Sequence, residues 1–178
     1  KNIQQVEKEL DRFLDILKRV KAEQQVDELR KRLEQLVKNQ DKIDQQIRQT
    51  DSSTRDSIFE RLSLEQKISK RELSEINNAM TAAAKNVKIF SRKTAQSLED
   101  LSNSELSKSS ENHLEKTIRS LNNKDSYKAM DESYAGIKDM QKIEQEMIEI
   151  LNEFQKETTR DMSQKFRFIL KDLLTISK

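Results

Sequence analysis

The sequence predicts an all-α fold, an elongated antiparallel helical bundle or coiled coil with about three long helices and one short helix. The 178 residues include no proline and a single glycine, so the residues that make tight turns are almost absent. Apolar residues recur three and four positions apart over long stretches, which is the spacing of one helical face. Charged residues make up 37% of the chain, and because both signs are mixed along this helical pattern, disorder is disfavoured.

The first expected helix covers residues 3–49 and carries two apolar stripes. The first stripe has heptad spacing, and the second begins after a slip of two residues, which predicts a bend or a change of packing partner within residues 21–25. Gln40 belongs to the second stripe, where it either fixes register as a buried polar residue or marks an exposed end. The first stripe comprises Ile3, Val6, Leu10, Phe13, Leu17 and Val20, and the second comprises Ala22, Val26, Leu29, Leu33, Leu36, Gln40, Ile43 and Ile47.

A polar cluster at residues 50–54 predicts the first break, because short polar side chains compete with the helical backbone and cap the helix that follows. The second expected helix covers residues 55–102, with an apolar seam that continues through Val87 and Phe90. Serines followed three residues later by Gln or Glu leave open whether this helix is continuous near Leu64.

The third expected helix is the short one and covers residues 105–122. The sequence Ser102-Asn103-Ser104 predicts the turn before it, with Ser102 and Glu105 forming a capping box. Asparagine tolerates the left-handed conformation, so Asn122-Asn123 predicts the end of this helix.

The fourth expected helix covers residues 126–177 and is capped by Asp125 or Ser126. Gly136 lies inside its apolar pattern, where glycine costs about 1 kcal/mol relative to alanine. A close helix contact or a bend is therefore expected at this glycine.

Helices of about 45 residues would be roughly 70 Å long. A short turn cannot span that length, so long helices joined by short turns are predicted to lie antiparallel. We expect residues 1–178 to form a single elongated helical region, to which another copy of the chain could add helices. The chain starts without methionine and stops on a helical pattern, so we expect a fragment of a longer protein. Any membrane anchor or catalytic domain would then lie outside the fragment.

The composition argues against an enzyme. The chain has no cysteine, and His113 is its only histidine, so neither a zinc knot nor a histidine-rich metal site is expected, and no cofactor is predicted. No nucleophile elbow or catalytic triad is arranged around the serines. The 34 basic and 32 acidic residues give a net charge of +2, which does not favour nucleic acid as a partner.

Two surfaces are candidates for partner binding. The first is a basic stripe within a stretch that has no acidic residue from Ile76 to Leu98, although a solvated face that attracts the acidic stretch 139–161 would explain it as well. The second is the apolar tail after Gln164, which suits the end of a bundle or an amphipathic surface for a membrane or a partner. The candidate residues are Lys85, Lys88, Arg92 and Lys93 in the stripe and Phe166, Ile169 and Leu173 in the tail.

Residues 13–47 read FLDILKRVKAEQQVDELRKRLEQLVKNQDKIDQQI. This stretch resembles the coiled-coil soluble regions of uncharacterised, membrane-anchored bacterial envelope proteins. The resemblance implies a bacterial origin and a membrane-associated, extracytoplasmic rod at the cell envelope, attached to membrane segments outside the fragment. If the resemblance is set aside, a cytoplasmic location is expected. The resemblance implies no functional residue.

The expected function is that of a structural or scaffolding module that acts through helix-mediated protein association, with another protein or with itself. The alternative is a regulatory or membrane-peripheral binding module that uses the basic stripe or the amphipathic C-terminal segment. A helical region of an enzyme whose active domain lies elsewhere is a third possibility.

Overall fold

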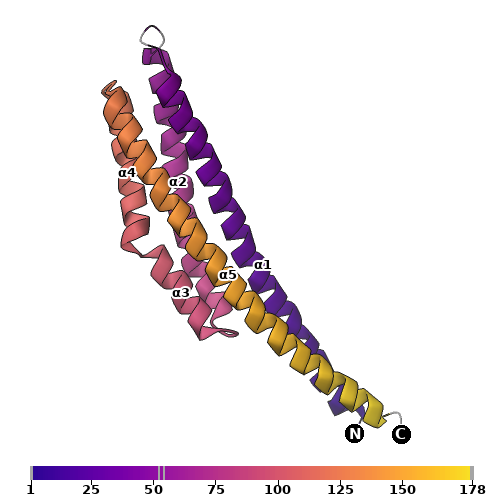
Figure 1. The fold of residues 1–178 in the computed structure, drawn as a ribbon. Coiled ribbons are helices and arrows are strands. Elements are labelled where there is room, and N and C mark those ends of the chain that lie inside the picture. Colours follow the sequence, from indigo (N-terminus) through magenta and orange to yellow (C-terminus); the bar gives the residue numbers. More distant parts are fainter. Residues whose placement is uncertain (1, 52, 54, 177–178) are drawn as a thin grey trace.

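The computed structural model describes residues 2–51, 53 and 55–176, and these residues form five helices and no strand (Figure 1). The all-α helical bundle predicted from the sequence is confirmed. The helices are α1 (Asn2–Gln49), α2 (Arg55–Val87), α3 (Arg92–Ser102), α4 (Glu105–Asn122) and α5 (Ser126–Ile176).

The helices form an elongated antiparallel bundle with the layout of four helices, in which α3 and α4 together occupy the third position. Helix α2 returns along α1, and α4 returns along α2, as the contact of Lys70 with Glu115 at 2.9 Å shows. Helix α3 already runs back beside the end of α2, where the Thr81 and Ser102 hydroxyl oxygens lie 3.0 Å apart. Helix α5 then packs on α1, α3 and α4, so that α2 and α5 lie on opposite corners of the bundle.

The second predicted helix, residues 55–102, is wrong at its C-terminal end, because the chain reverses at residues 88–91. Ser91 has extended backbone angles, and its hydroxyl accepts a hydrogen bond from the Thr94 amide at 3.1 Å, which caps α3. The turn predicted at residues 102–104 is a short interruption at residues 103–104 between α3 and α4, since Ser102 still belongs to α3. Near Leu64, by contrast, α2 is continuous.

The caps that begin and end α4 differ in detail from the prediction. Ser104, not Ser102, is the N-cap, and its hydroxyl accepts from the Ser107 amide at 3.1 Å. The left-handed residue after the helix is Lys124, with φ 59°, while Asn123 has φ −84°. The predicted cap of α5 by Asp125 is confirmed, because its carboxylate accepts from the Lys128 amide at 3.1 Å.

Close approach of α4 and α5 explains the one glycine. A Cβ atom at Gly136 would lie 3.2 Å from Cβ of His113, which confirms the expected contact. The His113 ring is held between two carboxylates of α5, with Nδ1 2.6 Å from Glu132 and Nε2 3.9 Å from Asp139. Both observations assign His113 to helix packing.

The hydrophobic core runs along the part of the bundle where α1, α2, α5 and the α3–α4 segment pack together, and it contains the second stripe of α1. Fully covered side chains include Val26 and Leu33 of α1, Ile76 of α2, Leu98 of α3 and Phe154 of α5. The first stripe of α1, in contrast, contributes no side chain to this core. The slip at residues 21–25 therefore coincides with the point where the helix enters the bundle.

Glu144 of α5 is expected to make stability depend on pH. Burial raises its pKa, and the Glu34 carboxylate of α1 adds to the rise. The fold thus favours the protonated form, so its contribution to stability is present below the ordinary carboxyl pKa and is lost as pH rises through the raised value. We expect Glu144→Gln to raise the free energy of unfolding near neutral pH by less than about 1 kcal/mol, and to have no effect in acid.

Urea unfolding at both pH values measures this effect, with Glu146→Gln as the control because Glu146 is an exposed neighbour on the same helix. An equal gain from Glu144→Gln at both pH values would contradict the prediction.

Candidate association surface

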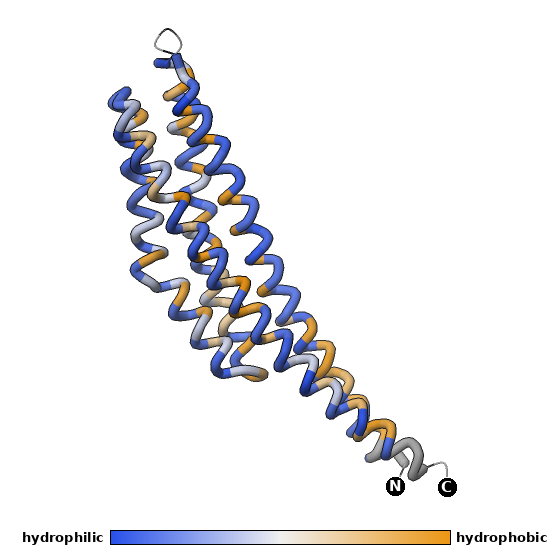
Figure 2. Tube along the Cα trace, viewed as in Figure 1, coloured by the Kyte–Doolittle hydropathy of each residue, from blue (hydrophilic) through white to orange (hydrophobic). Residues whose placement is uncertain are grey.

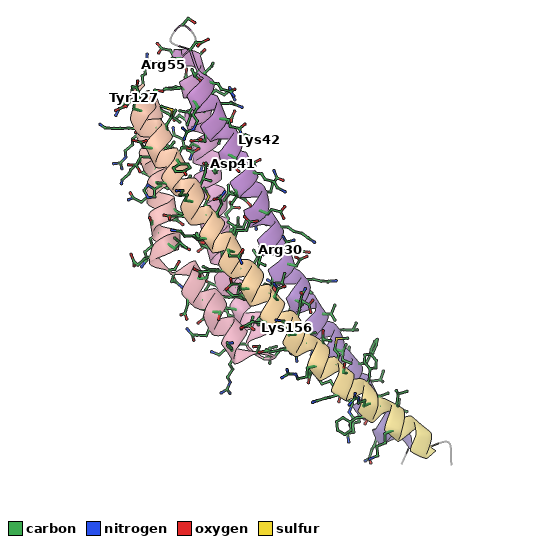
Figure 3. All side chains as sticks on the ribbon, in the orientation of Figure 1. Arg30, Asp41, Lys42, Arg55, Tyr127 and Lys156 are labelled. Carbon is green, nitrogen blue, oxygen red and sulfur yellow. The ribbon has the colours of Figure 1, made fainter. Side chains whose placement is uncertain are left out.

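Two helices extend beyond the rest of the bundle and form its narrow end (Figure 1). The reversal at residues 88–91 ends the cover that α2 and α3 give to α1 and α5. Past this point lie residues 2–18 of α1 and 162–176 of α5, which we call the two-helix end. Lys156, labelled on α5 in Figure 3, lies close to the point where it begins.

Arg19 joins the two-helix end to the bundle. Its side chain is buried, Nε donates to the Thr158 hydroxyl at 3.0 Å, and one terminal nitrogen donates to the Asp161 carboxylate at 2.9 Å. The guanidinium carbon lies 5.8 Å from the ring centre of Phe90 and 5.7 Å from that of Phe154. One cation therefore binds α1, α5 and the α2–α3 reversal together. No motif or apolar spacing in the sequence marks this arginine.

Contacts between α1 and α5 in the two-helix end are largely polar. Ile16 is the buried apolar side chain of α1 there, and Asp15 pairs with Lys165 of α5. Partial burial of the Lys165 ammonium opposes its charge, but hydrogen bonds to Asp15 and Asp161 outweigh this and raise its pKa. The helices are thus held together here mainly by ion pairs around one isoleucine.

The first apolar stripe of α1 is exposed along this end, from 77% of Ile3 to 48% of Leu17. In α5, Phe166 and Leu170 are exposed and Ile169 is partly buried, while the Leu173 side chain lies outside the described residues. Figure 2 shows hydrophobic segments on both helices at this end. The spacing predicted a helix-packing seam, but no helix among the described residues covers it.

Helical geometry places the exposed stripe of α1 and two exposed residues of α5, Phe166 and Leu170, on the same side of the α1–α5 pair, whereas Phe168, which is 57% exposed, lies on the other side of α5. In α1, Leu17 follows the buried Ile16 by one residue, and in α5, Phe166 follows Lys165, which contacts α1. One residue is a rotation of about 100°, and since the helices are antiparallel, the same rotation turns both sets to one side. The covered stripe of α1, from Ala22 onward, is rotated the opposite way from the line that faces α5. We call the exposed side the apolar face; it points away from α2 and α3, and it comprises Ile3, Val6, Leu10, Phe13, Leu17, Phe166 and Leu170.

The basic stripe predicted at residues 85–93 is not on one helix. Lys85 lies in the last turn of α2, Lys88 lies in the reversal, and Arg92 and Lys93 begin α3, so the four cations surround the chain reversal. Ile89 at the centre of this group is 77% exposed.

Lys93 pairs with Glu153 of α5 at 2.8 Å, and the contact raises the pKa of Lys93 and lowers that of Glu153. This pair fits the alternative interpretation, in which the stripe attracts the acidic stretch of the last helix. Because both side chains are exposed, the pair contributes little to stability.

The described residues hold neither a candidate metal centre nor a candidate membrane span. They contain no cluster of three His, Asp or Glu side chains that could hold a metal ion. Within the same residues, no helix is both long and apolar enough to cross a membrane.

Comparison with known protein families, curated proteins and solved structures gives no match to this chain.

Proposed function

We propose that the protein is a structural or scaffolding module that acts through helix-mediated protein association, and that the apolar face of its two-helix end is the association surface. One observation carries the proposal: a heptad stripe that continues from Ile3 to Leu17 remains exposed, while the second apolar stripe of the same helix is buried. Heptad spacing is the pattern by which one helix packs on another.

The energetics favour a partner on this face. Burial of apolar surface gains roughly 25 cal/mol per Å², and a half-exposed leucine or phenylalanine offers about 100 Å². Contiguous apolar surface of this kind marks interaction sites in soluble proteins. The remaining length of the bundle then acts as a spacer, because the long helices hold the surface far from the C-terminal end of α1 at Gln49.

A protein partner fits the charges better than an anionic membrane does. Lys165, one of the cations beside the apolar face, is already paired with Asp15 and Asp161. The exposed stripe of α1 is also accompanied by acidic residues, including Glu7 and Asp11, which anionic lipid would repel. Ile89, at the centre of the basic group, lines a shallow pocket together with Lys18 and Lys21 of α1.

Site-specific photo-crosslinking in the native cell tests the proposal. The full protein carries a photoreactive amino acid in place of Leu10 or, as the matched control, Leu64; both leucines are 56% exposed, but Leu64 lies in the body of the bundle. We expect protein adducts from position 10 that Phe13→Gln abolishes, and none from position 64. Adducts with lipid instead of protein, or equal adducts from both positions, would overturn the proposal.

A further inference from the structure

We propose that the partner of the apolar face is a second copy of this chain, and that the two copies pack side by side about a two-fold axis along the two-helix end. Helix α1 of each copy then lies on α5 of the other, which makes a four-helix assembly at the narrow end. This inference rests on the proposed function and adds the identity and arrangement of the partner. Closed two-fold dimers of this kind use the same surface of both copies.

The charges of the two helices select this arrangement. Residues 7–15 of α1 contain four acidic residues, Glu7, Glu9, Asp11 and Asp15, against Lys8 and Arg12. Residues 163–171 of α5 contain three basic residues, Lys165, Arg167 and Lys171, and no acidic one. Asp15 and Lys165 already pair within one chain, so the opposite charges that the second copy adds are those of Glu7 and Asp11 against Arg167. Packing α1 on α5 of the other copy brings opposite charges within a Debye length of about 8–10 Å, whereas α5 on α5 would bring like charges together.

The apolar side chains match in level along the axis. Within one chain, Asp15 contacts Lys165 and Arg19 contacts Asp161. Four residues forward in α1 therefore correspond to four residues backward in α5. Counting onward by equal steps in both helices places Leu10 level with Leu170, and Phe13 within one residue of the level of Phe166. A two-fold axis along the helices keeps these levels, so Leu10 meets Leu170 of the partner subunit.

The exposed area is sufficient for a stable dimer. The seven side chains of the apolar face are each about half exposed or more, which at about 100 Å² each gives roughly 700 Å² per copy. Interfaces of standard size bury about 800 Å² per partner. Because the apolar face points away from α2 and α3, the bundles do not obstruct the approach of a second copy.

Analytical ultracentrifugation of the full chain measures the association. We expect the wild type to be a dimer, and Phe13→Gln to raise its dissociation constant about 100-fold, because a two-fold interface carries each substitution twice. Leu64→Gln, at an equally exposed leucine, should leave the constant unchanged. Circular dichroism checks that both variants keep the helical fold. A wild type that stays monomeric at all concentrations, or a dimer indifferent to Phe13→Gln, would overturn the proposal.

Disulfide trapping tests the arrangement, since the natural chain has no cysteine. A mixture of Leu10→Cys and Leu170→Cys proteins should oxidise to a mixed dimer, because a disulfide needs Cβ atoms within about 4.5 Å. Leu10→Cys alone should remain uncrosslinked, and its self-linkage would show α1 on α1 and overturn the arrangement. If photo-crosslinking at position 10 yields an adduct with a different protein while the chain is monomeric, only the second copy fails and the proposed function stands.

Discussion

Arg19→Ala is expected to lower the free energy of unfolding by about 2–3 kcal/mol and to loosen the two-helix end from the bundle. The substitution removes hydrogen bonds to Thr158 and Asp161 and leaves the rings of Phe90 and Phe154 without the cation between them. Asp161 is about one-third exposed, so water can solvate its carboxylate, and the loss stays below that of a fully buried pair. Arg19→Lys should recover only part of the lost free energy of unfolding, because a single ammonium group cannot replace the planar guanidinium with its several donors.

Urea unfolding followed by circular dichroism gives the free energy, and hydrogen exchange locates the loosening in residues 2–18 and 162–176. Arg92→Ala is the matched control, because Arg92 is exposed and makes no ion pair among the described residues. We expect the control to change stability by less than about 0.5 kcal/mol. Equal effects of the two substitutions would show that Arg19 does not hold the junction.

Helix type and most breaks could be predicted because they depend on local chemistry. Helix α1 ends at Gln49 and α2 begins at Arg55, on either side of the predicted break, and Asp125 caps α5 as the sequence indicated. The predicted capping by the polar cluster at 50–54 falls partly outside the described residues. The reversal at residues 88–91 was missed, because Val87 and Phe90 continue the apolar spacing across it. The signal there is Ser91 with Thr94 three residues later, whose hydroxyls lie 2.9 Å apart. Apolar periodicity alone could not separate a continuous helix from one that turns back on itself.

The candidate surface could be predicted only in part. The slip after Val20 indicated a change of packing partner, but spacing does not reveal whether a seam is covered, which depends on where other helices end. Arg19 escaped notice for a related reason. A lone arginine within a charged helix resembles a solvated residue, and its buried role depends on Phe90, which the reversal brings beside α1 and α5. Such long-range positioning has no signature in a single sequence.

Gln40 and Gln66 form a buried polar pair between α1 and α2. Both side chains are fully buried, and Nε2 of Gln66 donates to Oε1 of Gln40 at 2.8 Å. The remaining atoms, Nε2 of Gln40 and Oε1 of Gln66, have no hydrogen-bond partner among the residues that the structure describes. Each amide is therefore half satisfied, and an unsatisfied buried polar group costs about 1–3 kcal/mol.

Replacing one member of this pair should destabilise the fold, whereas replacing both should stabilise it. We expect Gln66→Leu alone to cost about 1–3 kcal/mol, because the whole amide of Gln40 is then buried without a partner. The double replacement by leucine removes every unsatisfied atom and adds apolar contacts, so we expect a gain of about 1–2 kcal/mol over the wild type. Urea unfolding of the two single variants and the double variant closes a double-mutant cycle.

The sign of the coupling is the decisive quantity in that cycle. Additive losses would mean that the two glutamines act independently and that their hydrogen bond does not couple α1 to α2. A double variant that is more stable than the wild type but unfolds less cooperatively would instead assign the pair to register, because a buried polar contact penalises every shifted alignment of the two helices. Long helices with repeating apolar spacing need such a contact, since sliding by one heptad otherwise preserves most of their packing.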